Sequence, residues 1–200
     1  MISLLKNIDE FDVILASESP RRYELLRMIG LEFKVRPSHV DEIYQDHLSP
    51  EEYAIENAKK KCMSIATKYP NSLVISADTI VVYKNEILEK PKDEMHALEI
   101  LKKLSNHTHE VITGFGFILG DEQKSFFDYE ETRVTFRKLT EYEIKAYIET
   151  GEPFDKAGGY GAQGFGSLII KKVDGCFFNV VGLPLPKFFT SLDKFLNELP

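Results

Sequence analysis

The segment Ser72–Tyr83 limits what this chain can fold into more than any other, because it is a long run of apolar, strongly β-forming residues. It predicts a long strand that is turned at Lys84-Asn85-Glu86. The shorter run Phe11–Ala16 predicts a second, buried strand near the start of the chain. Both strands are expected to belong to one sheet.

Helix signals alternate with these strands in the first half of the chain. Three helices are predicted, beginning at Ser19-Pro20, at the capping box Ser49-Pro50-Glu51-Glu52, and after Asp93. The side chain of Ser19 can cap the first helix, which stops at Gly30, and the second helix reaches about Lys68.

The second half of the chain is richer in strands. Strands are predicted at His109–Leu119 and Lys124–Arg137, followed by a hairpin of Ser167–Val173 and Cys176–Val181 around the turn Asp174-Gly175. Two further helices are predicted, one from the capping box of Thr140 and Glu143 to Gly151 and one over about Lys187–Asn197. Since helices alternate with strands early and strands pair antiparallel late, the sequence predicts an α/β chain, or an α+β chain, with a mixed sheet.

Composition excludes several classes of partner. The net charge of −7 argues against a broad surface for nucleic acid or anionic membranes, because phosphate polymers select basic faces. No apolar run approaches the roughly 18 residues needed to cross a bilayer, and the acidic start of the chain is unlike a signal peptide. The two cysteines, Cys62 and Cys176, suit buried thiols in a reducing cytoplasm. We therefore expect one cytoplasmic domain over residues 1–200, or two lobes sharing one sheet.

The first candidate site is the junction Ser17-Glu18-Ser19-Pro20-Arg21-Arg22, where a strand leads into a helix. The first turn of a helix has backbone N–H groups without intrahelical partners and the positive end of the dipole. Two arginines there are disfavoured unless an anion offsets them. A phosphate does so, because arginine forks, backbone amides and the hydroxyls of Ser17 and Ser19 all bind it. A capped helix with two solvated arginines is the alternative, and spacing alone does not decide between the two.

The second candidate is Asp78, which interrupts the β-forming run of Ser72–Tyr83. Aspartate is disfavoured in strands and is costly to bury without a partner. Such a local inconsistency is typical of a position where function overrides propensity. The alternative is a strand that reaches the surface or bends at Asp78.

The third candidate is the glycine-dense segment Asp155–Gly166. Its glycines fit the letters Gly-x-Gly-x-x-Gly, but the dinucleotide motif needs a strand before it and a helix after it, and here that order is reversed. The segment is better explained as a loop whose glycines allow close approach of a ligand, with Lys156 and Gln163 as polar groups. A flexible lead-in to the hairpin is the alternative.

Four short segments carry weaker signals. Asp41-Glu42 offers paired carboxylates that suit Mg²⁺ or Mn²⁺, but equally a solvated loop. Most of Lys59-Lys60-Lys61 is expected on a solvated helix face, with room for one lysine to turn inward. Lys90 lies in an extended segment, which alone means little. His107 and His109 alternate on a strand and allow a two-histidine metal site, although a plain strand surface is the more common explanation.

Taken in order, these segments resemble the Maf family of nucleotide pyrophosphatases over about residues 11–186. The motifs that carry the resemblance are Ser19-Pro20-Arg21-Arg22, Val40-Asp41-Glu42, Ala58 to Lys61, Ala77-Asp78-Thr79, Lys90-Pro91, Thr113-Gly114, Asp155-Lys156-Ala157-Gly158, Tyr160-Gly161, Gln163-Gly164 and Val181-Gly182-Leu183-Pro184. No single motif is decisive, but the ordered set is specific. Glu18, Gly159 and Ala162 depart from the usual family residues and affect the expected substrate preference more than the activity.

The resemblance implies hydrolysis of a nucleoside triphosphate between its α and β phosphorus atoms, giving the monophosphate and pyrophosphate with a divalent cation such as Mg²⁺ or Mn²⁺. It also implies a Maf/ITPase-like fold, an elongated mixed sheet flanked by helices in two lobes around a cleft. Within the family, Arg21 directly after Pro20, Thr79 after the catalytic aspartate and Gln163 in the Tyr-Gly-x-Gln segment resemble the branch that acts on dTTP and UTP rather than on 7-methyl-GTP.

The resemblance further implies a role for each candidate residue. Asp78 is expected to be the general base and, with Glu42, the metal ligand. The residues expected to bind the substrate are Ser17, Ser19, Arg21, Arg22, Lys61, Thr79, Lys90, Asp155, Lys156 and Gln163. Of these, Arg21, Thr79 and Gln163 are expected to set specificity, because an amide complements the N–H and carbonyl edge of uracil or thymine.

Two other functions stay open at the level of the sequence. One is a non-catalytic, nucleotide-binding regulator of cell division, and the other is a pyrophosphatase for modified or non-pyrimidine triphosphates. The intact pair of Asp78 and Glu42 argues against the regulator, which needs no activated water. The expected partner is a small nucleotide, with no nucleic-acid polymer and no membrane. A homodimer, the identity of the metal and the choice between dTTP and UTP are left open.

Overall fold

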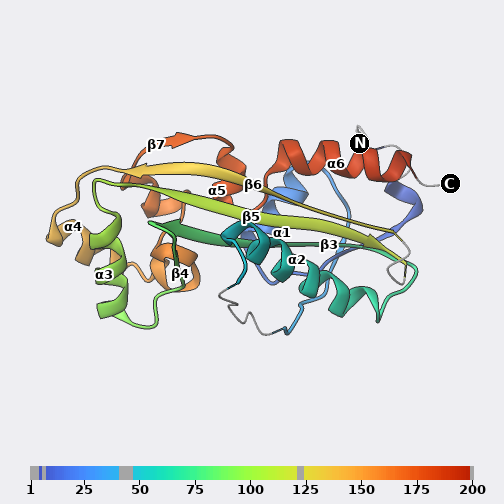
Figure 1. The fold of residues 1–200 in the computed structure, drawn as a ribbon, viewed down its shortest axis with the longest axis horizontal. Coiled ribbons are helices and arrows are strands. Elements are labelled where there is room, and N and C mark those ends of the chain that lie inside the picture. The colour runs from blue at the N-terminus through green and yellow to red at the C-terminus, as the bar shows by residue number, and fades with distance from the viewer. Residues whose placement is uncertain (1–4, 6–7, 41–46, 121–123, 199–200) are drawn as a thin grey trace. The chain divides into compact units, whose positions relative to one another are not determined.

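A computed structural model describes residues 5, 8–40, 47–120 and 124–198 of the chain. The chain divides into two compact units, each assembled from separate segments (Figure 1). Unit 1 comprises Met1–Asp78, Thr113–Glu130 and Gly182–Pro200. Unit 2 comprises Thr79–Ile112 and Glu131–Val181.

Most helices and strands belong to one unit alone. Those of unit 1 are η1 (Ile8–Glu10), β1 (Asp12–Leu15), α1 (Pro20–Met28), β2 (Lys34–Val35), α2 (Pro50–Ala66) and α6 (Leu185–Asn197). Those of unit 2 are β4 (Glu86–Leu88), α3 (Glu94–Leu104), α4 (Glu141–Glu149), η2 (Glu152–Asp155), η3 (Ala157–Gly159), η4 (Gly164–Leu168), β7 (Ile170–Asp174) and α5 (Phe177–Val181). Both units receive residues from β3 (Ser72–Tyr83), β5 (Thr108–Leu119) and β6 (Lys124–Phe136). Among the described residues, no helix combines the length and apolar character that a membrane span requires.

The strands form one mixed sheet in the order β2-β1-β3-β5-β6-β7, with β4 added to β3. Strand β1 pairs in parallel with β2 and with β3, so that Ile14 lies opposite Lys34 on one side and Val74 on the other. Strand β3 pairs antiparallel with β4, and β6 pairs antiparallel with β7. The predicted α/β class with a mixed sheet flanked by helices is confirmed.

The predicted helix starts at Ser49 and Thr140 are confirmed. At each one, the hydroxyl accepts a hydrogen bond from the N–H of the glutamate three residues later, and that glutamate's carboxylate accepts one from the cap residue's N–H. Asp93 likewise caps α3 through the N–H of His96 at 2.8 Å. These local hydrogen bonds satisfy first-turn donors that the helix itself leaves open, which is why the sequence alone locates the three helices.

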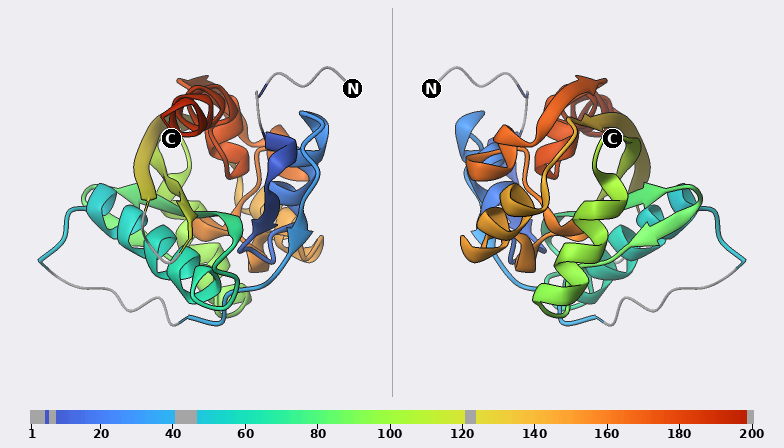
Figure 2. Two further views of the ribbon diagram at one scale, coloured as in Figure 1. Left: turned by 90° about the vertical axis from the view of Figure 1, so that its right-hand side faces the viewer. Right: turned by 90° about the vertical axis from the view of Figure 1, so that its left-hand side faces the viewer.

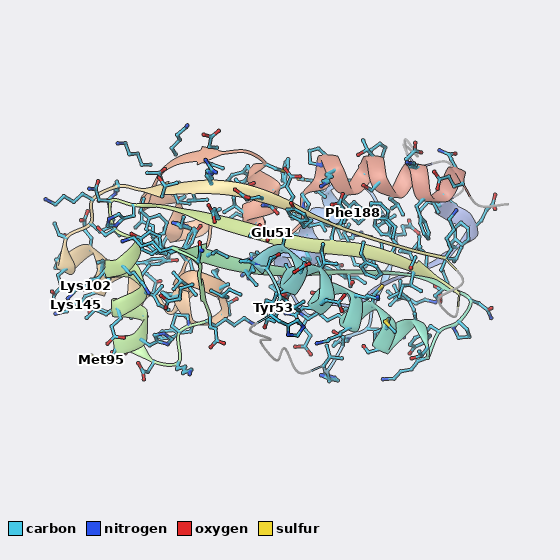
Figure 3. The ribbon with its side chains drawn as sticks, in the orientation of Figure 1. Glu51, Tyr53, Met95, Lys102, Lys145 and Phe188 are labelled. Atoms are coloured by element: carbon cyan, nitrogen blue, oxygen red, sulfur yellow. The ribbon has the colours of Figure 1, made fainter. Side chains whose placement is uncertain are left out.

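In unit 1, α2 and α6 cover opposite faces of β5 (Figures 1 and 2). A β-carbon on Gly114 would lie 2.3 Å from the carbonyl oxygen of Ala54, so the backbones of α2 and β5 are in close contact. Alternate residues of a strand point to opposite faces. Accordingly Phe115 and Phe117 pack against Phe188 of α6, which Figure 3 labels, with ring centroids 6.3 and 5.3 Å away.

In unit 2, helices α3 and α4 lie side by side over a core that includes the fully buried Leu101 and Phe136. An ion pair links the two helices, since Lys102 of α3 lies 2.8 Å from the carboxylate of Glu141 on α4. Lys145 of α4 lies 2.8 Å from the same carboxylate, and Figure 3 labels both lysines. Helix α4 also packs against η2, and α3 packs against η3, in the segment that follows α4.

The predicted hairpin over Ser167–Val181 is wrong. Only its first half contains a strand, β7, and the second half forms the short helix α5. The reason is a set of buried hydrogen bonds that sequence periodicity does not reveal. Asn179 donates from Nδ2 to the carbonyl of Val111 at 2.9 Å and to the hydroxyl of Thr132 at 3.1 Å, and the N–H of Cys176 donates to the same hydroxyl. A short apolar run fits a strand or a helix, and here these contacts decide.

Candidate functional site

Residues 16–19 lead from β1 into the first turn of α1. Pro20 occupies the first helical position and Ser19 precedes it in an extended conformation. Ser19 is the N-cap residue, as predicted, but its side chain makes no cap hydrogen bond. Its backbone N–H instead donates to the hydroxyl of Ser17 at 3.2 Å. The positive end of the helix dipole at this turn suits an anion.

Arg22 is held in one orientation inside unit 1. Its side chain is buried, with 8% of the residue exposed, which is unusual for arginine. Its Nε donates to the carbonyl of Gly182 at 2.9 Å, and its Nη1 donates to Ser17 Oγ at 3.1 Å. Arg21, one residue earlier, is half-buried. The structure thus brings Ser17 and Arg22 together, as the sequence predicts for an anion site.

Asp78 lies buried in β3 and is paired with side chains from α2. The ammonium of Lys61 is 2.6 Å from Oδ1, and both side chains are almost inaccessible. The amide of Asn57 donates to Oδ2 at 3.1 Å. The buried aspartate that interrupts a strand therefore has partners, and Lys61 is the member of the lysine run that turns inward.

The charges around Asp78 keep it ionised. Burial alone would raise the pKa of Asp78, but the neighbouring ammonium of Lys61 lowers it below the ordinary value, aided by the guanidinium of Arg22 and the hydrogen bond from Asn57. A buried ion pair of this kind needs further hydrogen bonds to offset its desolvation, and Asn57 supplies one of them. Together Ser17, Arg22, Asn57, Lys61 and Asp78 form what we call the unit 1 polar cluster.

The unit 1 polar cluster contains oxygen atoms that suit a hard divalent cation. Besides the carboxylate of Asp78, the amide oxygen Oδ1 of Asn57 is buried and accepts no hydrogen bond from any described residue. Carboxylate and amide oxygens are the ligands that Mg²⁺ accepts while it keeps several of its waters. Glu42, the other predicted ligand, lies outside the described residues, as does Asp41. Within the described part of the chain, no three acidic, histidine or cysteine side chains gather as a metal site.

In unit 2, the glycine-rich segment after α4 forms the three short turns η2, η3 and η4 rather than a flexible lead-in. Lys156 is folded back within it: its Nζ lies 2.5 Å from a carboxylate oxygen of Asp155 and donates to the carbonyl of Glu152 at 2.7 Å. Gln163 stands just before η4 and is exposed. The segment thus holds the ammonium of Lys156 through two contacts of its own, and it exposes the side chain of Gln163.

Lys90 lies on a segment that is bonded to this same loop. The N–H of Gly158 donates to the carbonyl of Glu89 at 3.2 Å, and a β-carbon on Gly159 would lie 3.1 Å from the ring of Pro91. Lys90 itself is exposed between these two contacts. The structure therefore brings the Lys90 segment and the Lys156 segment together within unit 2.

The predicted site residues are divided between the two units. Ser17, Ser19, Arg21, Arg22, Lys61 and Asp78 belong to unit 1, whereas Thr79, Lys90, Asp155, Lys156 and Gln163 belong to unit 2. Thr79 follows Asp78 directly on β3 and is half-buried.

Two residues with direct roles in these arrangements were missed from the sequence. Asn57 lies four residues before Lys61 on α2, and residues with that spacing share a helix face, so an inward Lys61 would have pointed to Asn57. Glu152, whose carboxylate accepts hydrogen bonds from the N–H groups of Phe165 and Gly166, gave no signal because those contacts link residues more than ten positions apart.

The prediction that His107 and His109 alternate on one strand is wrong, because only His109 belongs to β5. His107 precedes β5 and is exposed, with its ring 5.5 Å from that of Tyr83. His109 is buried and its Nε2 lies 2.7 Å from the hydroxyl of Tyr160. Burial lowers the pKa of His109 to about 3, so this ring is neutral and serves as part of the core.

Residues 12–195 match the protein family described as Maf-like protein. The chain belongs to the Maf family. A protein of Caldicellulosiruptor saccharolyticus named dTTP/UTP pyrophosphatase is 49% identical over 191 residues, which cover 94% of this chain and 96% of that protein. A protein of the same name from Clostridioides difficile is 42% identical, covering 93% of this chain and 96% of the relative.

Among solved structures, the Ham1 protein of Staphylococcus aureus is similar in fold. Its TM-score is 0.51 at 17% sequence identity, and the match covers 93% of this chain and 98% of the other. At that identity the likeness concerns the fold alone.

Proposed function

We propose that this chain hydrolyses dTTP and UTP between the α and β phosphorus atoms, releasing the nucleoside monophosphate and pyrophosphate. The observation that carries the proposal is the buried, ionised Asp78 held by Lys61 and Asn57, with the guanidinium of Arg22 close enough to act on its charge. The names of the relatives, which are 42% to 49% identical over nearly the whole chain, support the same activity.

In the proposed reaction, a water oxygen attacks the α phosphorus and the bond from that phosphorus to the bridging oxygen of the β phosphate breaks. The pyrophosphate leaves with the electron pair of that bond, and the proton of the water passes to the carboxylate of Asp78. Such a reaction depends mainly on positioning and on stabilising charge, since little covalent work falls to the protein.

Lys61 and Asn57 set the orientation and the pKa of the Asp78 carboxylate. They fix its carboxylate in one orientation, and the low pKa keeps it ready to accept a hydrogen bond from water. The same low pKa makes Asp78 a weak base, so a water of ordinary acidity is a poor partner for it. A divalent cation held by Asp78 and Glu42, with Mg²⁺ and Mn²⁺ as candidates, would supply charge that neutralises phosphate oxygens and acidifies the water.

The positive groups have separate tasks in this proposal. Arg22 and Arg21, with the backbone amides of the first turn of α1 and the hydroxyls of Ser17 and Ser19, bind phosphate oxygens at the β1–α1 junction. Lys90 and Lys156 bind phosphate oxygens, while Asp155 orients Lys156 through its ion pair. Thr79 and Gln163 recognise the pyrimidine, because an amide can pair with its adjacent carbonyl and N–H groups.

The test is an assay of the purified chain with UTP, dTTP, CTP, ATP and GTP, each with Mg²⁺ or Mn²⁺, in which pyrophosphate and orthophosphate are measured separately. We expect pyrophosphate from UTP and dTTP, at least about tenfold faster than from the other nucleotides. Release of orthophosphate, or binding without turnover, would reject the proposal. Preferential cleavage of purine or modified triphosphates would instead favour a broader role in removing unwanted nucleotides.

A further inference from the structure

Glu152 gathers three hydrogen-bond donors around one carboxylate. Its Oε1 accepts from the hydroxyl of Tyr147 at 2.9 Å and from the N–H of Gly166 at 3.0 Å, and its Oε2 accepts from the N–H of Phe165 at 2.9 Å. Two consecutive backbone amides that point at one anion form an anion-binding concavity. In this chain the anion is the protein's own side chain.

Tyr147 extends the arrangement to a second point on the same loop. Its hydroxyl donates to Glu152 and accepts a hydrogen bond from the N–H of Gly161 at 3.3 Å. Burial raises the pKa of Tyr147 far above its ordinary value, and the neighbouring Glu152 carboxylate raises it further. The phenol therefore stays protonated and can act as donor and acceptor at once.

The loop wraps so closely around the Glu152 carboxylate that side chains are excluded. A β-carbon on Gly164 would lie 2.7 Å from Oε2 of Glu152, and Gly164 also has a positive φ of 65°. A β-carbon on Gly166 would lie 2.0 Å from the carbonyl oxygen of Gly161. These glycines of the motif are thus explained by contact with Glu152 and with the loop itself.

Gln163 lies between the two anchored points. Gly161, two residues before it, is bonded to Tyr147, and Phe165, two residues after it, is bonded to Glu152. Ala162 beside it is buried, whereas Gln163 is exposed. With both flanks held, the backbone of Gln163 has little freedom, and its amide projects from a fixed position.

We propose that Glu152 is a positioning residue for base recognition, acting through Gln163. By occupying the concavity formed by Phe165 and Gly166, its carboxylate fixes the loop 161–166 and so presents the Gln163 amide to the pyrimidine. This inference rests on the proposed function, in which Gln163 contacts the base. It adds a residue that touches neither the phosphates nor the base yet determines which base is accepted.

The kinetic test compares Glu152→Gln with a matched control, Glu149→Gln, which removes the same charge from an exposed position at the end of α4. The amide of glutamine replaces one acceptor oxygen with a donor, which cannot accept from a backbone N–H. The readout is the ratio of kcat/KM for UTP to kcat/KM for CTP. We expect Glu152→Gln to lower this ratio roughly tenfold, as Gln163→Ala does, and Glu149→Gln to leave it unchanged.

The double variant Glu152→Gln/Gln163→Ala decides whether the two residues act together. If Glu152 acts through Gln163, the double variant lowers the ratio no further than Gln163→Ala alone. A ratio that is unchanged in Glu152→Gln, with kcat/KM reduced equally for both nucleotides, shows a purely structural role and overturns the inference. Losses that multiply in the double variant overturn it as well.

Hydrogen exchange provides a readout independent of catalysis. Because Phe165 and Gly166 bond to different oxygens of Glu152 and glutamine keeps only one, at least one of these two amides should exchange about tenfold faster in Glu152→Gln, while Glu149→Gln leaves both protected. Unchanged protection would reject the anchoring role. If the wild type releases no pyrophosphate, the proposed function fails separately, and the UTP-to-CTP ratio is then measured as a ratio of Kd values on the same variants.

Discussion

The Nζ atom of Lys61 lies 2.6 Å from Oδ1 of Asp78, and both side chains are buried. This pair joins helix α2 to strand β3 and gives the strand a charged residue where its sequence would otherwise be apolar. Such a pair is a weak source of net stability, because desolvation offsets much of the attraction. Its presence in the core is better explained by the chemistry of the carboxylate.

The pair predicts a specific pattern of stabilities. Asp78→Asn should lower the free energy of unfolding by about 3–5 kcal/mol, because the ammonium of Lys61 then lies buried without its counter-charge. Lys61→Met should have a similar cost. The double variant should cost clearly less than the sum of the two, and all three should lose pyrophosphate release. Urea unfolding measures the free energies, and strictly additive losses would contradict the pairing.

Substitution of Arg22 tests its proposed role in binding phosphate. Arg22→Lys keeps the charge but cannot reproduce the fork that bonds the carbonyl of Gly182 and the hydroxyl of Ser17. We expect KM for UTP to rise by about tenfold or more, with a smaller effect on kcat. Arg27→Lys, on the exposed side of the same helix, is the control and should behave as the wild type. Equal effects of the two substitutions would remove Arg22 from its proposed role.

The lowered pKa of the buried His109 predicts that the protein loses stability in acid. Its pKa is about 3 in the folded protein, below the value of about 6.5 expected in the unfolded chain, so the unfolded state binds a proton first as the pH falls. The stability due to the neutral ring is fully present above about pH 6.5. It is lost between about pH 6.5 and 3, with a slope of up to about 1.4 kcal/mol per pH unit.

The measurement is the free energy of unfolding against pH for His109→Gln and for the exposed control His107→Gln. The first substitution should flatten the curve between about pH 6.5 and 4, whereas the second should leave its slope close to that of the wild type. A slope that survives in His109→Gln would assign the acid sensitivity to other groups.

The close contact of Gly114 with the backbone of α2 predicts that a larger side chain at this position destabilises the protein. An alanine there would place its β-carbon 2.3 Å from a carbonyl oxygen and 2.6 Å from a backbone nitrogen of α2, and backbone atoms cannot rotate away. We expect Gly114→Ala to lower the free energy of unfolding by at least about 1–3 kcal/mol. Gly151→Ala, where the added carbon meets nothing within 4 Å, should show only the smaller cost of its positive φ. Thermal unfolding compares them, and equal shifts would contradict close packing at Gly114.

Much of the fold was accessible from the sequence because its signals are local. The capping boxes at Ser49 and Thr140 and the β-forming run of β3 specify their own elements through neighbouring residues. The helix α5 was not accessible, because Asn179 finds its partners on strands about fifty to seventy residues away. Local preference could not choose between strand and helix there.

In the candidate site, too, some residues can be recognised from the local sequence and others cannot. Asp78 was recognisable because a carboxylate within a β-forming run breaks the local pattern. Asn57 and Glu152 break no pattern, since polar residues on a helix or in a turn are ordinary. Asn57 can be inferred from helix spacing only once Lys61 is known to point inward, and the role of Glu152 rests on contacts with residues more than ten positions away.

The central claim is that water attacks the α phosphorus of a pyrimidine triphosphate with Asp78 as the base. Hydrolysis of UTP in water enriched in ¹⁸O tests it most directly, with mass spectrometry of both products. We expect the label in UMP and not in pyrophosphate, and we expect Asp78→Asn to form no labelled UMP at a measurable rate. Label in pyrophosphate or orthophosphate, or labelled UMP formed by Asp78→Asn as fast as by the wild type, would contradict it.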